Sequence, residues 1–360
     1  MTTFAKVTSP YIRKETSVKR MMTDVIIALL PLVIFAVYRF GMNAFTRILV
    51  AVLSMILVEV IVVMVRHKPH PRVKGFKARF LDRFSKLNIT NIVTPAVSAI
   101  IFSMMIPSTL PIYVVFVGAS LGILVGKMFF GGLGANIFNP AATAFILVLV
   151  SFPSQFSYTG IDAVAGATPL NAIAGSLANV STMVQNYSLV DLFLGNIPGG
   201  MGEISSILIL VGAIYLFVRK AADWRITVSL LSAFSVLVLV AAFALGLNNP
   251  FEVLAYQLLS GGLLFGAVYM ATDPVTAPVT KPGRWIFGLL IGSLVVLIRL
   301  FGSNVEGMAY AILIGNMFAP LIDYYKWSTN KYSIKMIVGY SVTLVILALV
   351  VFIGLGGFKL

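Results

Sequence analysis

The stretch that decides the fold class is Ile48-Leu-Val-Ala-Val-Leu-Ser-Met-Ile-Leu-Val-Glu59-Val-Ile-Val-Val-Met-Val65. Its eighteen residues include one charge, and a helix of about this length crosses the ~30 Å hydrocarbon core of a bilayer. The 360-residue chain as a whole is similar, with 59% hydrophobic and 11% charged residues. Because soluble domains carry about 25% charged residues, this composition excludes a water-soluble fold. The long uninterrupted runs also exclude a membrane β-barrel, whose strands alternate between apolar and polar residues.

Eleven apolar runs follow one another along the chain, so we expect an all-α polytopic protein of ten or eleven transmembrane helices. They cover about 23–38, 46–65, 92–106, 108–126, 137–152, 204–218, 227–246, 252–271, 286–301, 307–322 and 337–355. Several runs are shorter than the ~20 residues that a straight span needs. Pro107 and Pro111 also divide the stretch 92–126. We therefore expect some of the helices to be broken inside the protein.

The basic residues are divided very unevenly between alternate connecting segments. With residues 1–22 placed in the cytoplasm, 22 of the 26 Lys and Arg residues, Lys127 among them, fall on the cytoplasmic side. The four on the other side are Arg39, Arg47, Arg299 and Lys359. The positive-inside rule therefore predicts a cytoplasmic N-terminus. It also accounts for the net charge of +14, so no nucleic-acid partner is expected.

The same count divides the chain into three parts. A membrane domain over 23–325 follows the N-terminal segment, and residues 326–360 form a basic cytoplasmic segment with one additional helix. Within the membrane domain, the stretch 153–203 is an extracytoplasmic loop that is too long for a passive turn. Long loops on a rigid scaffold usually carry a functional site.

Two stretches of the chain resemble each other weakly. Gly126-Lys-Met-Phe-Phe-Gly131 precedes Asn139-Pro140, and Gly261-Gly-Leu-Leu-Phe-Gly266 precedes Asp273-Pro274. A proline inside a membrane segment frees backbone carbonyls, and paired breaks of this kind are typical of a central binding site. Chance similarity is the alternative, since Gly and Pro are common in membrane helices.

Three acids lie in apolar surroundings, namely Glu59, Asp273 and Asp323. A carboxylate within a membrane segment is costly, so we expect these residues to belong to an ion pathway. Each acid could instead have a purely structural role, and the case for that role differs among the three. Asp273 is also suited to capping a broken helix, and Asp323 to lying at the membrane surface beside Lys326. Glu59, near the middle of its run, has the weakest alternative.

The absence of cysteine limits the redox chemistry of this chain. It excludes disulfides, iron–sulfur clusters and covalent c-type haem, and the two histidines, His67 and His70, both lie in a basic stretch. No dinucleotide-binding fingerprint follows a predicted strand. We therefore expect no metal site, no catalytic residue and no NAD site here. Any electron carrier is held without thiolate or imidazole ligands.

Several motifs together resemble one known family. They are Ser9-Pro10-Tyr11, Gly131-Gly-Leu-Gly-Ala-Asn136-Ile-Phe-Asn139-Pro140, Asp162-Ala-Val-Ala-Gly166-Ala167-Thr168, Gly195-Asn-Ile-Pro-Gly-Gly-Met-Gly-Glu203, Ala271-Thr-Asp273-Pro-Val-Thr276 and Ala319-Pro-Leu-Ile-Asp323-Tyr. In this order they resemble RnfD, the D subunit of the Rnf ion-translocating ferredoxin:NAD oxidoreductases, and the homologous NqrB, the B subunit of the Na⁺-translocating NADH:quinone oxidoreductases. The resemblance covers about residues 9–325.

The resemblance implies two flavins. A flavin transferase would join FMN through a phosphoester to Thr168, with Asp162, Gly166 and Ala167 matching the family's attachment motif and Ala163 and Ala165 departing from it. A second, non-covalent flavin, riboflavin, is implied within the membrane domain, where Asn136 and Asn139 are the candidate contacts. Asn139 is equally suited to capping a helix that starts at Pro140.

The resemblance further implies a membrane electron-transfer subunit that helps couple ferredoxin oxidation and NAD⁺ reduction to Na⁺ or H⁺ export. Its partners would be the A, B, C, E and G subunits of the Rnf complex, in the bilayer of a prokaryotic cell membrane, with Thr168 on the extracytoplasmic side. Two alternatives stay open. One is a secondary transporter or channel for a small solute, and the other is a scaffold protein whose flavin site is not used.

Overall fold

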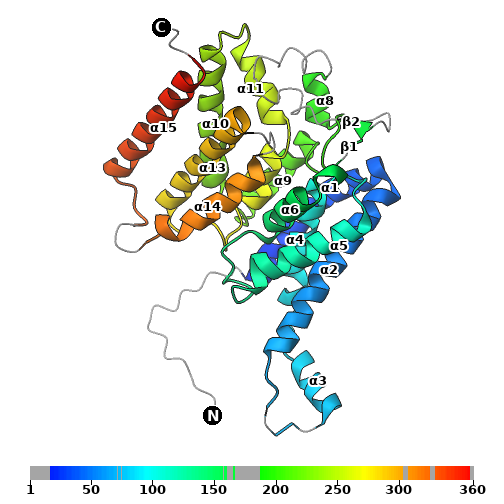
Figure 1. The fold of residues 1–360 in the computed structure, drawn as a ribbon. Coiled ribbons are helices and arrows are strands. Elements are labelled where there is room, and N and C mark those ends of the chain that lie inside the picture. Colours follow the sequence, from blue (N-terminus) through cyan, green and yellow to red (C-terminus); the bar gives the residue numbers. More distant parts are fainter. Residues whose placement is uncertain are drawn as a thin grey trace.

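The computed structural model describes residues 17–70, 72–73, 75–156, 158–159, 165–166, 187–302, 307–324 and 329–356. Within these residues each of the eleven apolar runs forms a helix or a bent pair of helices (Figure 1). The predicted class, an all-α polytopic membrane protein with broken helices, is confirmed. The described strands are the two-residue pair β1 (Tyr158–Thr159) and β2 (Ala165–Gly166), which are antiparallel with Tyr158 opposite Gly166.

The helices differ in whether they can cross a membrane alone. Those that are long and apolar enough are α1 (Val18–Phe40), α2 (Met42–Arg66), α10 (Trp224–Ala244), α13 (Lys281–Phe301) and α15 (Ile334–Gly354). Shorter apolar helices are α4 (Thr90–Met105), α5 (Ile112–Ile123) with the π-helical turn η1 (Leu124–Met128), α6 (Pro140–Ser151), α9 (Ser206–Val218) and α14 (Met308–Ile322). A further span is bent by 64° between α11 (Pro250–Leu259) and α12 (Leu263–Phe265), which continues into the π-helical turn η5 (Gly266–Met270). Outside the spans lie α3 (Phe76–Phe84), the turn η2 (Pro153–Gln155) and α8 (Leu189–Leu194).

The breaks occur where the sequence predicts them or where glycine permits them. Helix α4 ends at Met105, shortly before Pro107, and α5 begins directly after Pro111. Proline cannot donate a helical hydrogen bond and restricts the residue before it, so the helix cannot continue through this stretch. Between α11 and α12, Gly261 has a φ of 65°, a left-handed backbone conformation that residues with a Cβ rarely adopt.

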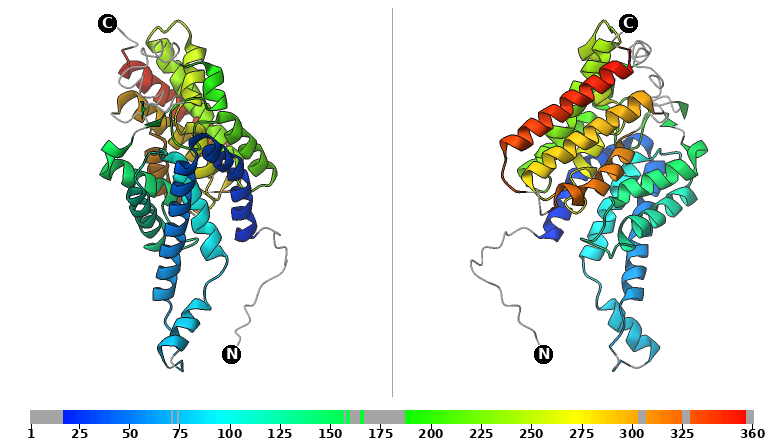
Figure 2. Two further views of the ribbon diagram at one scale, coloured as in Figure 1. Left: turned by 90° about the vertical axis from the view of Figure 1, so that its right-hand side faces the viewer. Right: turned by 60° about the vertical axis from the view of Figure 1, so that its left-hand side comes forward.

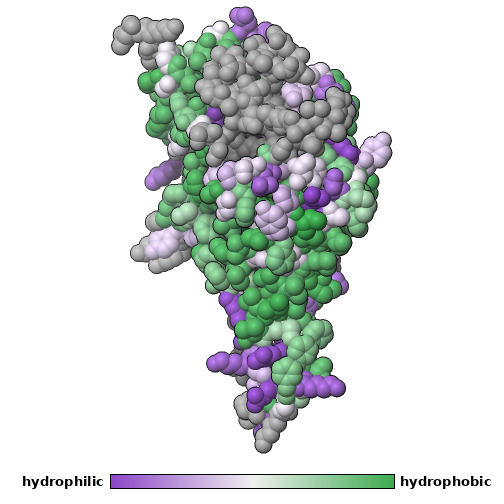
Figure 3. Space-filling model, turned by 45° about the vertical axis from the view of Figure 1, so that its right-hand side comes forward, coloured by the Kyte–Doolittle hydropathy of each residue, from purple (hydrophilic) through white to green (hydrophobic). Residues whose placement is uncertain are grey.

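The packed helices form two groups that meet along the middle of the molecule (Figures 1 and 2). In the first, α2 packs on α4 and α5, and α5 packs on α6. In the second, α10 packs on α13, and α13 on α14. Helix α15 lies outside them against α10 and α13, with Val351 as its one buried residue. Figure 3 shows a broad hydrophobic surface, with hydrophilic side chains gathered at the narrow tip of the molecule.

Glycines allow close contact between α5 and α6 in the first group. A Cβ at Gly122 would lie 2.3 Å from the Cβ and 2.7 Å from the Cα of Ala144 in α6. Close backbone approach at small residues is the usual way in which membrane helices pack. Gly118, Gly122 and Gly126, spaced four residues apart, therefore form a ridge that joins α5 and η1 to α6.

We predict that Gly122→Ala lowers the free energy of unfolding by about 1–3 kcal/mol, because the added methyl group must push α5 and α6 apart. The measurement is thermal unfolding of the purified chain in detergent. Gly339→Ala in α15 is the matched control, since no atom lies within 4 Å of its new Cβ. Equal losses in both variants would contradict this packing.

Candidate functional site

A pair of buried opposite charges lies where α2, α4 and η1 meet. The Lys127 ammonium lies 2.6 Å from Oε2 of Glu59 and donates a second hydrogen bond, 2.7 Å long, to Oγ1 of Thr94. Asn91 donates from Nδ2 to Oε1 of Glu59 over 3.2 Å. The Glu59 side chain is 1% exposed and that of Lys127 is 3% exposed. Each charge compensates the other where solvation by water is lost.

The position of Lys127 corrects one expectation. The cation count placed it in a cytoplasmic segment, but it is buried and paired with Glu59. It is also the partner that sequence reasoning missed for this acid. Its immediate context, Leu124-Val-Gly-Lys-Met-Phe-Phe130, is apolar, and this signal alone marks it as a different kind of cation from those in the polar segments.

A central cavity borders the pair on the Lys127 side. It encloses about 670 Å³ of space not occupied by protein atoms, part of it open to the outside. The polar residues that line it include Lys127, Thr94, Asn136, Asn139 and Asp273. They come from α4, from η1 and the segment after it, and from the segment that follows η5. The structure therefore brings the two polar-proline breaks of the weak repeat to one cavity.

Amide side chains join these breaks across the molecule. Asn139 donates from Nδ2 to the Met270 carbonyl at the end of η5 over 3.2 Å. Asn316 of α14 accepts from the Asn139 backbone N–H over 3.0 Å and donates to the Thr276 carbonyl over 3.2 Å. Backbone groups released by the helix breaks thus find partners within the protein, as a membrane interior requires.

The capping interpretation of Asn139 is confirmed. Its Oδ1 accepts from the backbone N–H groups of Ala141 and Ala142, at 2.9 and 3.2 Å, at the start of α6. Both polar atoms of this amide are therefore bonded within the chain. Asn136 also lines the cavity, where its amide nitrogen lies 3.4 Å from the Phe138 carbonyl. Of the two residues expected at riboflavin, Asn136 is the better fitted to contact a ligand.

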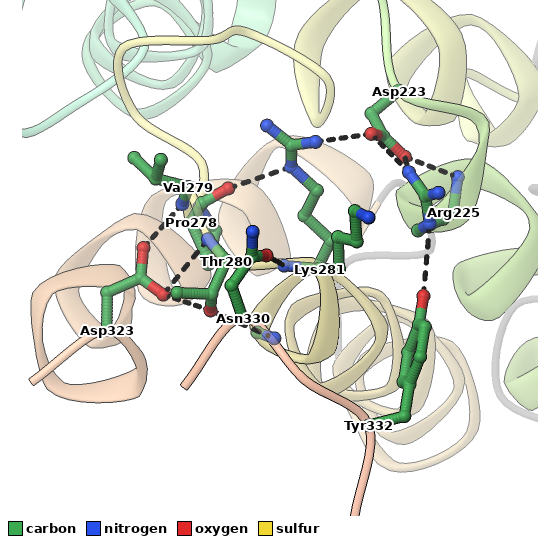
Figure 4. Close-up of polar contacts among 11 residues, drawn as sticks. Asp223, Arg225, Pro278, Val279, Thr280, Lys281, Asp323, Asn330 and Tyr332 are labelled. Carbon is green, nitrogen blue, oxygen red and sulfur yellow. Dashed lines mark hydrogen bonds and ion pairs between the residues drawn. The ribbon is translucent and has the colours of Figure 1, made fainter. Parts of the chain in front are cut away.

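The other two candidate acids both hold turns. Asp273, partly buried at the cavity, accepts from the Val275 N–H over 3.2 Å and from the Thr276 hydroxyl over 3.3 Å. Asp323, directly after α14, accepts from the Thr280 hydroxyl over 2.5 Å and from the Val279 N–H (Figure 4). Asp323 therefore fixes the start of α13 and does not line the central cavity.

A second pocket borders the pair on the Glu59 side, and we call it the vestibule. It encloses about 710 Å³ of non-protein space, including open solvent. Glu59 and Asn91 lie in it, and the cations Arg66 and Lys86 and the imidazole of His67 also line it. The Glu59–Lys127 pair thus lies between the vestibule and the central cavity.

Arg299 and Glu203 are among the other buried charged groups, and neither was expected to be buried. Arg299, counted as an extracytoplasmic cation, is buried within α13 and donates to Oε1 of Gln257 over 2.9 Å and to the Ser260 carbonyl over 3.1 Å. It therefore binds backbone oxygen at the α11–α12 break. Glu203 is buried too, and accepts from the Gly200 N–H over 3.1 Å. Arg299 lies near the end of the apolar run 286–301, where it was counted as a cation of the extracytoplasmic side, whereas Glu203 directly precedes the run 204–218.

The end of the long loop enters the packed body of the protein. The Met201 N–H donates to the Ile106 carbonyl over 3.1 Å, and the Gly202 N–H donates to the Met104 carbonyl over 2.8 Å. These bonds satisfy carbonyls released where α4 ends. In the attachment motif, Gly166 lies in β2, whereas Asp162, Ala167 and Thr168 lie outside the described residues. The expected FMN attachment stays a prediction.

The comparison with known proteins agrees with the motifs and the fold. Residues 6–332 match the model of the NQR2, RnfD, RnfE family. The chain belongs to this family. The matched residues include those of the vestibule, the buried pair and the central cavity. The match ends at residue 332, in the segment that precedes α15.

Named relatives of the family fall into two groups. The chain is 34% identical to the D subunit of the proton-translocating ferredoxin:NAD(+) oxidoreductase complex of Clostridium ljungdahlii, over 88% of this chain and 92% of the relative. It is 31% identical to the D subunit of the ion-translocating oxidoreductase complex of Actinobacillus succinogenes, over 89% and 96%. It is 38% identical to the B subunit of the Na(+)-translocating NADH-quinone reductase of Ectopseudomonas mendocina, over 65% of this chain and 60% of the relative.

We predict that Glu59→Gln and Lys127→Met each lower the free energy of unfolding by about 3–5 kcal/mol, because each leaves one buried charge without its partner. The double variant Glu59→Gln/Lys127→Met should lose much less than the sum of the single losses. Thermal unfolding of the purified wild-type chain, the two single variants and the double variant gives the four stabilities of this double-mutant cycle.

Asp82→Asn is the control, because the His67–Asp82 contact is 3.7 Å long and both side chains are at least 25% exposed. Its effect should be within about 0.5 kcal/mol. Additive losses for the Glu59 and Lys127 variants would contradict a coupled buried pair.

Proposed function

We propose that the chain is a membrane electron-transfer subunit of an Rnf-type complex that couples ferredoxin oxidation and NAD⁺ reduction to Na⁺ or H⁺ export. The observation that carries this proposal is the buried Glu59–Lys127 pair between two cavities of a helical membrane body. The two relatives that are D subunits support the lineage, because each is matched over more than nine tenths of its length. The relative from the quinone reductase is matched over 60% of its length.

The ion pathway in this proposal runs through Glu59 and Asp273. They line adjoining cavities, and Lys127 lines the central cavity with its ammonium on Glu59. Buried charge of this kind in a membrane domain is costly, and ion or proton movement is its usual reason. Asp323 stays a predicted member of the pathway, and its bonds to Thr280 and Val279 give it a second role in holding α13 and α14 together.

The electron carrier in this proposal is FMN on Thr168, supported by the match of Asp162, Gly166 and Ala167 to the attachment motif. A phosphoester to a hydroxyl requires neither cysteine nor histidine, which suits a chain with no Cys and with both His in a basic stretch. When bound, FMN supplies one- or two-electron transfer. The partners would be the other Rnf subunits and the flavin transferase that attaches FMN.

We predict that Thr168→Ala abolishes covalent flavin, seen as loss of in-gel fluorescence from the denatured chain coexpressed with a flavin transferase. The hydroxyl is the only atom of this side chain that forms the phosphoester. Thr182→Ala in the same loop is the matched control and should keep the fluorescence. A colourless wild-type chain, or a fluorescent Thr168→Ala chain, would overturn the FMN assignment.

We predict that Asp273→Asn lowers ion export by the reconstituted complex at least tenfold, while ferredoxin:NAD⁺ electron transfer continues. The substitution removes the carboxylate charge from the central cavity and retains side-chain hydrogen bonding to Val275 and Thr276. The readout is the ratio of ions exported to NADH formed in proteoliposomes, and Asp82→Asn is the control. An unchanged ratio would remove Asp273 from the pathway.

The central cavity between broken helices also fits a second candidate, a transporter or channel for a small solute. The two functions separate in one experiment. Proteoliposomes that contain the chain alone should show no solute flux in the absence of an electron donor if the chain is an electron-transfer subunit. Flux without a donor favours the transporter.

A further inference from the structure

The Glu59–Lys127 pair forms a partition between the vestibule and the central cavity. Glu59 lines the vestibule, Lys127 lines the central cavity, and the two side chains touch at 2.6 Å. Leu133 lines both spaces, so they also adjoin beside the pair. Anything that passes from one space to the other along the two side chains must first separate them.

We propose that the Lys127 ammonium is a built-in cation that occupies the position of the transported cation, so that release of Lys127 from Glu59 opens the gate between the two spaces. This inference rests on the proposed ion-export function and assigns a gate to it. The cation would be a small monovalent one, Na⁺ or a proton. Nothing in the family resemblance or in the names of the relatives assigns a role to this lysine.

The surroundings of the Lys127 nitrogen are those of a cation site. Two oxygens face it, Oε2 of Glu59 at 2.6 Å and Oγ1 of Thr94 at 2.7 Å. The Thr94 hydroxyl donates its hydrogen to the Thr90 carbonyl over 2.8 Å, so its lone pairs are directed toward the ammonium. Oxygen ligands with one negative charge suit a hard cation as well as an ammonium.

Because of charge balance, a transported cation must replace the Lys127 ammonium at Glu59 and cannot bind in addition to it. Glu59 is neutralised by Lys127, and the cations Arg66 and Lys86 line the vestibule. A second cation beside Lys127 would meet like charge from the ammonium and from the vestibule, with little water to screen it. A transported cation can therefore reach Glu59 only as the lysine leaves.

A second carboxylate, that of Asp273, lies in the central cavity and could pair with Lys127 once it leaves Glu59. Asp273 lines the same cavity as Lys127, and in the described part of the chain it accepts hydrogen bonds from Val275 and Thr276 and forms no ion pair. Lys127 also lies in a π-helical turn, closed by a hydrogen bond of 2.9 Å from the Phe129 N–H to the Leu124 carbonyl. Such turns occur frequently at functional sites, and in this proposal a change to α-helical register turns the Lys127 side chain away from Glu59.

The test uses the assembled complex in proteoliposomes, with Na⁺ titrated at fixed pH and pH titrated without Na⁺. Whichever cation stimulates wild-type electron transfer is the coupling cation. In Lys127→Met, Glu59 has lost its internal competitor, so half-saturation should occur at a coupling-cation concentration at least tenfold lower. Coupled export should fall at least tenfold, because nothing displaces the bound cation. Half-saturation at the wild-type concentration would overturn the proposal.

A double variant separates the gate from a purely structural pair. Glu59→Gln/Lys127→Met removes both charges, so the fold keeps no unpaired charge and assembly should be retained, as size-exclusion chromatography would show. With a gate, electron transfer in this variant no longer responds to the coupling cation and export stays lost. If the pair is structural only, the double variant restores export, and the proposal fails.

Failure of the gate and failure of the proposed function give different results. If wild-type complex exports ions and Glu59→Gln does not, while Lys127→Met keeps the wild-type cation dependence, the function stands and the gate is wrong. If wild-type electron transfer moves no ion, the proposed function itself is wrong. Lys127→Gln is a second single variant without the ammonium charge. Its side chain can still form hydrogen bonds to Glu59 and Thr94, so it should bind the coupling cation more tightly than wild type, as Lys127→Met does.

Discussion

The structure depends on one constraint. Backbone N–H and C=O groups that lose their helical partners inside the membrane must be hydrogen-bonded within the protein. The helical backbone is interrupted after α4, between η1 and α6, between α11 and α12, and after η5, and each interruption leaves carbonyl groups without helical partners. Asn139 and Asn316 bond such groups at the Met270 and Thr276 carbonyls, and Arg299 does the same at Ser260. The bonds of Asn139 to Met270 and to Asn316 run from the start of α6 to η5 and α14, so this break also joins the two halves of the molecule.

The same breaks create the space in which charge can reside. The central cavity lies where η1, α6 and the segment after η5 converge, and Asn136, Asn139 and Asp273 of its polar lining lie at those interruptions. Glu59 and Lys127 lie at its border, neutral as a pair and costly if separated. A device that couples electron transfer to ion movement requires such a place, where a small change in local charge alters the energy of an ion.

The sequence predicted the fold class, the eleven helical segments and the proline breaks, because apolar run length and proline chemistry act locally. It also identified Glu59 and Asp273 as acids at the site. It did not predict the partner of Glu59, since Lys127 lies 68 positions away and only tertiary packing brings the two together. Charge counting treated Lys127 and Arg299 as solvated, which fails for cations that bind buried oxygens. The capping role of Asn139 was open in the sequence and is settled by its bonds to Ala141 and Ala142.

The most direct measurement is the distance between the Lys127 nitrogen and the Glu59 carboxylate in cryo-electron microscopy maps of the assembled complex, prepared once oxidised and once reduced. We expect contact between them in one state and, in the other, Lys127 displaced toward Asp273 with the passage between the vestibule and the central cavity open. A contact that is unchanged in both states, with the passage closed in each, would contradict a gating role for the buried pair.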